Sequence, residues 1–174
     1  LEAYVEKINY RGTIYEIDRR TSPTNIGVYL MSIAYAQLLG FINKREARQR
    51  IEATLSAIEN LEKYGGLLFN WYDTRNDAPL LHHDPRTPFP YVSMVDNSNL
   101  AAALLGVGSL FPRYRNRTRM LVESMRFDEF FDSSRDLFCG GGWVRTEGFR
   151  QYLILDRSFH YDFLASEALL LYVV

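Results

Sequence analysis

The chain has 174 residues, of which 47% are hydrophobic and 24% charged, and its formal net charge is −1. These values are typical of one globular domain, which at this length buries roughly 70% of its unfolded surface without disulfides or metal ions. The near-zero net charge argues against a nucleic-acid partner. No uninterrupted apolar stretch reaches the roughly 18 residues that a membrane-spanning helix requires, so no direct membrane insertion is expected.

The first predicted helix covers residues 24–39, which contain no charged residue. It follows the polar stretch "RRTSPTN", and Gly40 stands where a helix-ending glycine is common. Asn43 is predicted to cap a second helix, "KREARQRIEATLSAIENLEKY", which Gly65 and Gly66 would end. The second helix is amphipathic, with one apolar stripe formed by Ala47, Ile51, Leu55, Ile58 and Leu61.

The same pair of helix types then recurs along the chain. Residues 97–110, "NSNLAAALLGVGSL", carry no charge, Pro112 interrupts the pattern, and "RYRNRTRMLVESMRF" is amphipathic. A third apolar helix is predicted over residues 161–174. Helices that are apolar all round must be surrounded by protein. The sequence therefore predicts an all-α fold, an α/α toroid of helical hairpins with the apolar helices inside.

Irregular segments separate the hairpins. Residues 67–96 hold four of the six prolines and several aromatic residues, and a loop of this length in a compact domain is usually functional. Residues 127–157 are predicted to contain a short helix, an Asp-Ser turn and a strand that ends at the glycine run Gly140–Gly142, which we interpret as a tight bend. A short β-hairpin is compatible with this stretch.

Each apolar helix begins with a cluster of polar residues, and we expect these starts to line one shared cavity. Capping of the unpaired helix amides is the simpler explanation of any single polar residue there. Among the acids, Asp96, Glu167 and Asp73 are the candidate catalytic carboxylates, and each could instead be a buried acid paired with an arginine. The candidate substrate-binding residues are Asn25, Asn70, Trp71, Tyr72, Tyr91, Asn99, Tyr161 and Asp162.

Metal and cofactor chemistry finds little support in the sequence. His82 and His83 lie in a proline-rich loop without a nearby cysteine or histidine, and His160 is isolated along the chain. Cys139 precedes glycines and is expected to be a buried thiol. "CGGGW" lacks both the phosphate-loop and the dinucleotide-binding patterns. We therefore predict neither a metal site nor a cofactor.

Several stretches resemble, in the same order, bacterial cyclic β-1,2-glucan synthases and related glucoamylase-like proteins. They are "RTSPTNIGVYLMSIAYAQLLGFI", "LEKYGGLLFNWYDT", "YVSMVDNSNLAAALL", "FDEFFDSSRDLFCGGG" and "YDFLASEALL", which together cover most of residues 19–171. Two departures stand out. Ser98 replaces a usual glycine, and Cys139 with three glycines replaces a usual Ile-Gly-Tyr.

The resemblance implies an α/α toroid and carbohydrate-active chemistry on glucans, by hydrolysis or transglycosylation. The acids within the matching motifs are Asp73, Asp96, Asp162 and Glu167. Three inner helices make about half a toroid, so residues 1–174 are expected to be a single domain that is a fragment of a larger one, completed by the rest of the polypeptide. The expected partner is an oligo- or polysaccharide, and the expected location is the bacterial periplasm or cell envelope. A non-catalytic glycan-binding or scaffold domain on the same fold is the alternative.

Overall fold

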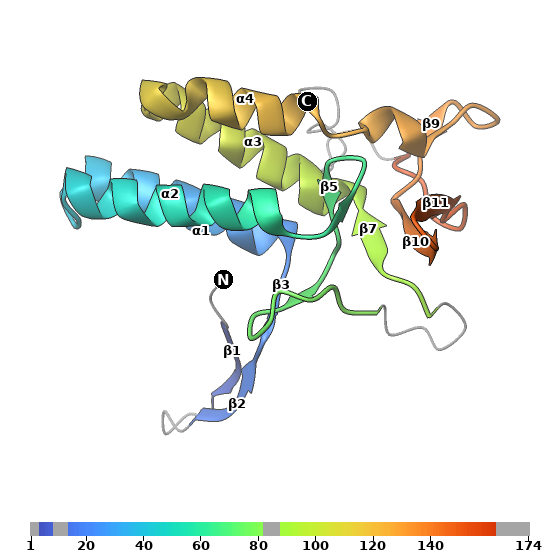
Figure 1. The fold of residues 1–174 in the computed structure, drawn as a ribbon, viewed down its shortest axis with the longest axis horizontal. Coiled ribbons are helices and arrows are strands. Elements are labelled where there is room, and N and C mark those ends of the chain that lie inside the picture. The colour runs from blue at the N-terminus through green and yellow to red at the C-terminus, as the bar shows by residue number, and fades with distance from the viewer. Residues whose placement is uncertain (1–3, 9–13, 82–87, 163–174) are drawn as a thin grey trace.

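The computed structural model describes residues 4–8, 14–81 and 88–162 (Figure 1). Its four α-helices form two antiparallel hairpins that lie side by side (Figure 1). The helices are α1 (Pro23–Leu38), α2 (Lys44–Asn60), α3 (Met94–Leu110) and α4 (Arg115–Glu123). The inner pair, α1 and α3, start at the same end of the molecule and run in the same direction, and α2 and α4 return along their outer sides (Figure 1).

The first hairpin begins and ends where the local sequence dictates. Ser22 is the N-cap of α1, with its Oγ accepting a hydrogen bond from the Asn25 amide at 3.2 Å, and Pro23 occupies the first turn. Gly40 adopts φ 79° just after the helix, which confirms it as the terminating glycine. Asn43 caps α2 by accepting from the Glu46 amide at 2.9 Å, as predicted.

The second hairpin is built in the same way. Ser93 caps α3 by accepting from the Asp96 amide at 3.3 Å. Pro112 then breaks the helix and opens the 3-10 turn η1 (Pro112–Tyr114), which leads into α4. Arg117 on α4 ties the two outer helices together, since its Nε lies 2.6 Å from Oε1 of Glu59 on α2.

Short strands occupy the segments before, between and after the helical hairpins. A three-stranded antiparallel sheet has the order β11-β10-β7, and the other strands pair two by two: β1 with β2, β3 with β6, β4 with β5, and β8 with β9. The 3-10 helix η2 (Phe127–Phe130) precedes β8. The strands are β1 (Tyr4–Ile8), β2 (Ile14–Asp18), β3 (Arg20–Thr21), β4 (Lys63–Tyr64), β5 (Leu67–Leu68), β6 (Tyr72–Asp73), β7 (Tyr91–Ser93), β8 (Phe131–Asp132), β9 (Leu137–Phe138), β10 (Gly141–Glu147) and β11 (Arg150–Leu155).

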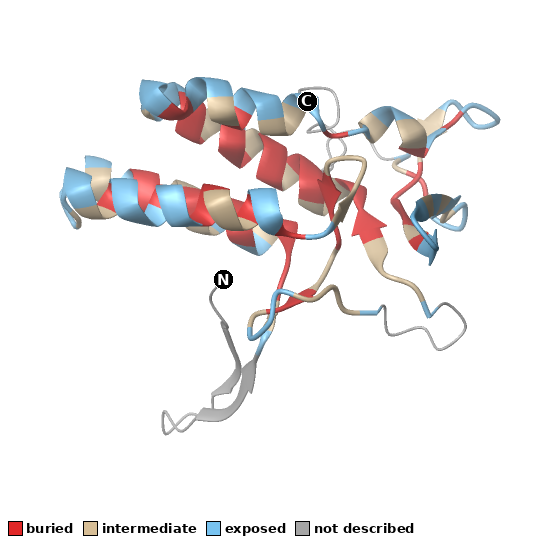
Figure 2. Ribbon diagram, viewed as in Figure 1, coloured by how far each residue is buried: buried red, intermediate tan, exposed pale blue. Residues whose placement is uncertain are grey.

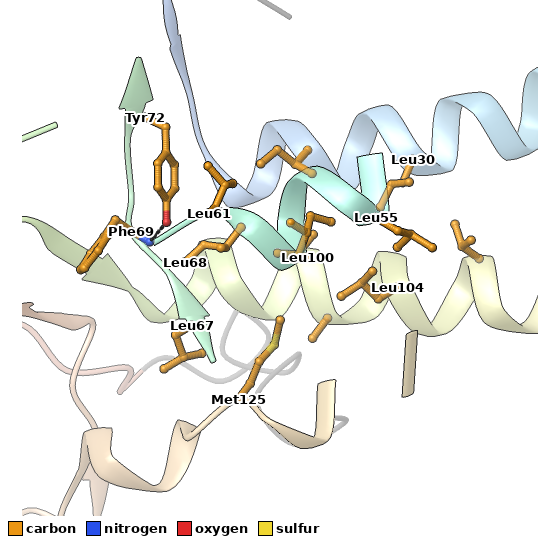
Figure 3. Packing of buried hydrophobic residues seen from close by; sticks show 14 of the residues in the cluster. Leu30, Leu55, Leu61, Leu67, Leu68, Phe69, Tyr72, Leu100, Leu104 and Met125 are labelled. Atoms are coloured by element: carbon orange, nitrogen blue, oxygen red, sulfur yellow. Dashed lines mark hydrogen bonds between the residues drawn. The ribbon is translucent and has the colours of Figure 1, made fainter. Parts of the chain in front are cut away.

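The hydrophobic core lies where α1, α2 and α3 meet (Figures 2 and 3). The predicted stripe of α2 is buried along its whole length, from Ala47 to Leu61. Leu30 of α1 and Leu100 and Leu104 of α3 are completely buried opposite it. A fully buried leucine contributes roughly 1.5–3 kcal/mol relative to an exposed one, so this three-helix contact stabilises the frame on which the loops sit.

Three expectations need correction. The fold is not all-α, because small sheets fill the irregular segments. The longest of the hairpins, β10–β11, pairs six residues of each strand. The second helix ends at Asn60 rather than at Tyr64, because Gly65 and Gly66 form the turn of the β4–β5 hairpin with φ 50° and 76°. The glycine run is a bend only at Gly140, since Gly141 and Gly142 begin the extended strand β10.

The third predicted apolar helix, residues 161–174, lies almost entirely outside the described residues. None of the helices that the structure describes has the length and apolarity needed to cross a membrane.

Candidate functional site

The starts of the two inner helices are joined by a direct side-chain contact. Nδ2 of Asn99 on α3 donates to Oγ1 of Thr24 on α1 at 3.0 Å. Each helix start presents unpaired amides and a partial positive charge, so the two starts together form a polar end to an otherwise apolar pair of helices. Polar residues near the starts of α1 and α3 therefore meet at this contact.

A buried asparagine fastens the segment after β4 to the start of α3. Asn97 is completely buried, and its Oδ1 accepts from the Leu68 amide at 2.8 Å. Its Nδ2 donates to the carbonyls of Leu68 and Ser93, both at 2.9 Å. Because all of these groups are buried, losing the amide would leave two polar groups of Leu68 unsatisfied. Asn97 therefore positions the residues that follow β5.

Tyr72 is a structural residue rather than a sugar contact. Its side chain is completely buried, and its Oη accepts from the Phe69 amide at 2.8 Å and donates to the Glu62 carbonyl at 2.6 Å (Figure 3). Burial raises the pKa of the Tyr72 hydroxyl well above its ordinary value. The ring has no surface to offer a ligand, so the expectation that it stacks on a saccharide is wrong.

Asn70, Trp71 and Asp96 form a connected polar group beside the start of α3. In the amide orientation that satisfies both neighbours, Nδ2 of Asn70 donates to Oδ2 of Asp96 at 2.9 Å, and Oδ1 of Asn70 accepts from Nε1 of Trp71 at 3.2 Å. The backbone of Asn70 is also held, because its N–H donates to the Tyr91 carbonyl at 2.7 Å. The guanidinium of Arg20 lies 5.0 Å from the centre of the Trp71 ring.

Asp73 lies three residues after Asn70 in the sequence, and its carboxylate is bound by an arginine instead of an amide. Both of its carboxylate oxygens are bound by the side chain of Arg75, and Oδ1 also accepts from the Arg75 amide at 2.9 Å. These hydrogen bonds lower the pKa of Asp73 to about 2. The carboxylate stabilises a tight turn in which Asp77 adopts φ 59°, so Asp73 is an ionised, paired group.

Tyr91 is half-buried on β7 and contacts residues that the sequence did not single out. Its Oη donates to Oδ2 of Asp156 at 3.4 Å, and its ring meets the Trp143 ring edge-on at 5.4 Å. Burial raises the pKa of Tyr91 well above its ordinary value. Gly141 makes this arrangement possible, because a Cβ there would lie 2.5 Å from the Tyr91 ring. A glycine run followed by a tryptophan was the only available signal.

Of the remaining candidates that the structure describes, Asn25 lies apart from this group, whereas Tyr161 is close enough to Tyr91 to help raise its pKa. Asn25 is exposed and lines an open groove of about 970 Å³ between α1 and α2, which contains none of the candidate acids. Tyr161 packs edge-on against Phe159 at 5.4 Å, and Asp162 is exposed. Glu167 lies outside the described residues. The structure therefore gathers Asn70, Trp71, Asp96 and Asn99 at one end, with Tyr91 and Asp73 beside them.

Comparisons with known proteins agree with this architecture. The model for the family described as "Protein of unknown function (DUF3131)" matches residues 12–173. Over 91 residues the chain is 48% identical to the cyclic beta-(1,2)-glucan synthase NdvB of Rhizobium meliloti (strain 1021). That stretch is 52% of the chain but only 3% of the synthase.

Among solved structures, an endo-beta-1,2-glucanase from Chitinophaga pinensis, in complex with sophorotriose and glucose, aligns with a TM-score of 0.64 at 15% identity. The alignment covers 80% of the chain and 34% of the glucanase. A candidate glucoamylase from Bacteroides fragilis NCTC 9343 aligns with a TM-score of 0.61 at 13% identity, over 70% of the chain and 30% of that protein. At such identities the likeness shows the fold alone, which the chain shares with part of these glucoamylase-like proteins. The chain thus belongs to the DUF3131 family.

Proposed function

We propose that this domain acts on a β-linked glucan, as a glycoside hydrolase or transglycosylase that uses two carboxyl groups. One observation carries the proposal: at the end where the two inner helices start, the side chain of Asn70 is hydrogen-bonded to both Asp96 and Trp71. The relatives support the substrate class, because the synthase is named for β-1,2-glucan and the glucanase for cleaving it.

Asp96 is the first of the two proposed carboxyl groups. It is half-buried in the first turn of α3, and Asn70 fixes one of its oxygens. Glycoside cleavage requires a second carboxyl group, about 5 Å away for retention or roughly 6.5–9.5 Å away for inversion. Glu167 is the proposed partner. Asp73 is less suited to donating a proton, because Arg75 keeps it ionised.

The same end offers groups that suit a saccharide. Trp71 is half-buried with its indole N–H bound to Asn70, so an aromatic surface stands beside the carboxylate and can stack on a sugar ring. Asn99, near the start of α3, carries an amide suited to sugar hydroxyls. An apolar ring with a few fixed polar groups is the usual composition of a small-molecule site.

A non-catalytic glycan-binding domain is the second candidate. Of the two candidate catalytic acids that the structure describes, Asp73 has a lowered pKa and is paired with Arg75, which leaves Asp96 as the one held only by an amide. A site with a single available carboxylate would bind a saccharide without cleaving it.

The test compares turnover with binding in the full-length protein. Reducing-sugar release and transglycosylation are measured on a panel of β-glucans that includes a β-1,2-glucan. Asp96→Asn and Glu167→Gln should each lower turnover by roughly 10²–10⁴-fold while the affinity for the glucan changes little. Asp77→Asn, at an exposed turn position, is the matched control and should leave turnover unchanged. A folded protein that binds a β-glucan but cleaves none would favour the binding domain, and one that neither binds nor cleaves any would contradict both.

A further inference from the structure

Three side chains that could bind a metal ion come together beside the β8–β9 and β10–β11 hairpins. Nε2 of His160 lies 3.0 Å from Oδ2 of Asp132 and 3.6 Å from Sγ of Cys139. The ligand atoms of the three residues lie within 4.8 Å of one another. Asp132 is 3%, Cys139 0% and His160 8% exposed. They come from β8, from the residue after β9, and from the segment after β11.

The backbone holds these side chains in place. Cys139 and His160 face each other in an isolated antiparallel bridge. The flanking amides complete it, since Gly140 donates to the Phe159 carbonyl at 2.9 Å and Tyr161 donates to the Phe138 carbonyl at 3.0 Å. The donor atoms are therefore set by main-chain geometry rather than by flexible side chains alone.

Hydrogen bonds cannot satisfy all three groups at once. The thiol of Cys139 and the carboxylate of Asp132 approach the same ring nitrogen, Nε2 of His160. A proton on that nitrogen can be given fully to one neighbour only, and without the proton the nitrogen faces a carboxylate oxygen as a second acceptor. A nucleophilic triad places its acid and its nucleophile on opposite ring nitrogens, so this is not one. A cation between the three atoms would satisfy all of them.

We infer that Asp132, Cys139 and His160 bind a divalent transition-metal ion of the zinc type. Sulfur, imidazole and carboxylate ligands together suit this borderline-soft class of ion. Tetrahedral zinc with ordinary bond lengths places its sulfur and nitrogen ligands about 3.6 Å apart and its nitrogen and oxygen ligands about 3.4 Å apart. The first spacing is already present between Sγ and Nε2. The pair of Nε2 and Oδ2, at 3.0 Å, must open by a few tenths of an ångström, and Sγ and Oδ2, which lie within 4.8 Å of each other, must reach a similar spacing when the ion binds. A water molecule completes four ligands.

The surroundings support a metal ligand at Asp132. Its other oxygen, Oδ1, accepts from the amide and the hydroxyl of Ser134 at 3.0 and 2.6 Å, which turns Oδ2 toward His160. Such outer hydrogen bonds are the usual means of orienting a metal-binding carboxylate. Arg157 lies 3.8 Å from Oδ2, but its side chain is 69% exposed and can turn into solvent when a cation is bound.

The site has a structural consequence for α3. The carbonyl of Gly140, which follows Cys139, accepts a hydrogen bond from the Met94 amide at the first turn of α3 at 3.0 Å. An ion that joins β8, Cys139 and His160 therefore rigidifies the segment that is hydrogen-bonded to the first turn of α3, which carries Asp96. Metal binding releases the thiol proton of Cys139 to solvent.

The test uses the full-length protein, freed of metal with a chelator and titrated with Co²⁺ or Zn²⁺ alone. The wild type should bind one equivalent of Co²⁺ more than Cys139→Ser or His160→Asn, and its spectrum should show a thiolate-to-cobalt charge-transfer band that both variants lack. Ser134→Ala should bind at least tenfold more weakly. The wild type should also unfold at a higher temperature with Zn²⁺, whereas His160→Asn should not respond.

The double variant His82→Ala, His83→Ala controls for binding by other imidazoles and should behave as the wild type. Absence of the charge-transfer band in the wild type, equal Co²⁺ stoichiometry in the wild type and Cys139→Ser, or loss of binding in the double variant would each overturn the inference. If Cys139→Ser does not fold, the wild-type spectrum decides.

Discussion

Two aspartates near the start of α3 have opposite environments. Asp73 is bound on both oxygens by Arg75, whereas Asp96 is held on one oxygen by the neutral amide of Asn70. A cation fixes the charge of a carboxylate, and an amide orients a carboxylate without neutralising it. At the residue scale, then, Asp73 maintains a turn, and Asp96 is the acid that we propose for catalysis.

The environment of Asp73 predicts that part of the free energy of unfolding is lost at acidic pH. Hydrogen bonds from Arg75 lower its pKa from 3.8 to about 2 in the folded protein. A lowered pKa stabilises the folded state above pH ~4, and this contribution is lost as the pH falls toward about 2. Asp73→Asn and Arg75→Gln should therefore each flatten the decrease in urea midpoint over this range. Variants that keep the full wild-type decrease would show that the pair does not contribute.

Some of these residue roles could be predicted from sequence and others could not. Ser22, Asn43 and Ser93 act as helix caps because capping is local, so residue type and spacing suffice. The contact between Asn70 and Asp96 joins loop and helix across a long separation, and no local pattern specifies it. Tyr72 was misassigned because an aromatic beside an acid has the same sequence signature whether its ring is buried or open.

At the scale of elements, the close approach of α1 and α3 depends on small residues. A Cβ at Gly27 would lie 3.2 Å from the Asn99 carbonyl, from Cα of Leu100 and from Cβ of Ala103. The first two contacts are with backbone, which cannot yield as a flexible side chain would. At Gly106 the corresponding neighbour is the flexible side chain of Met31, at 3.0 Å.

This difference predicts opposite effects for two glycine substitutions. Gly27→Val should destabilise the protein by about 2 kcal/mol or more, because the inner helices must separate. Gly106→Ala should be neutral or stabilising by up to about 1 kcal/mol, since alanine favours a helix and Met31 can shift. Urea unfolding of both variants measures the two effects. Equal losses in the two variants would contradict a tight backbone contact at Gly27.

The helices were predictable as elements, but some of their boundaries were not. Apolar periodicity located α1, α2 and α3, because burial of one face or of all faces follows directly from the pattern. The end of α2 differs from the prediction because "LEKY" favours a helix locally. In the structure, Lys63 and Tyr64 of this stretch pair with β5 as strand β4. The sequence does not show that Gly141 is extended and not bent, because glycine serves close packing as well as turns, and only the position of Tyr91 distinguishes the two.

At the scale of the whole molecule, α1 has an apolar face that the described residues leave uncovered. Val28, Tyr35 and Leu38 are all more than half exposed, although the uncharged sequence of α1 predicts burial on nearly every side. The aligned part of the glucanase is 34% of that protein. We propose that the remainder of the polypeptide covers this face and completes the toroid.

Two exposed apolar residues distinguish a covered face from an open one. Val28 on α1 and Met120 on α4 are similarly exposed, at 60% and 70%. In the full-length protein, Val28→Asp should cost about 2 kcal/mol or more because a charge enters an apolar interface. Met120→Asp should change stability by less than about 0.5 kcal/mol. Denaturant unfolding gives both values, and a neutral Val28→Asp would argue that nothing packs on α1.

The central claim is that the shared start of α1 and α3 binds a saccharide, and calorimetric titration of the full-length protein with a β-1,2-linked glucooligosaccharide tests it most directly. Trp71→Ala should weaken binding at least tenfold, or about 1.4 kcal/mol, because the ring beside Asp96 is lost. Phe41→Ala, an exposed aromatic at the opposite end of α1, should bind as the wild type does. Equal affinities of Trp71→Ala and the wild type would contradict the claim.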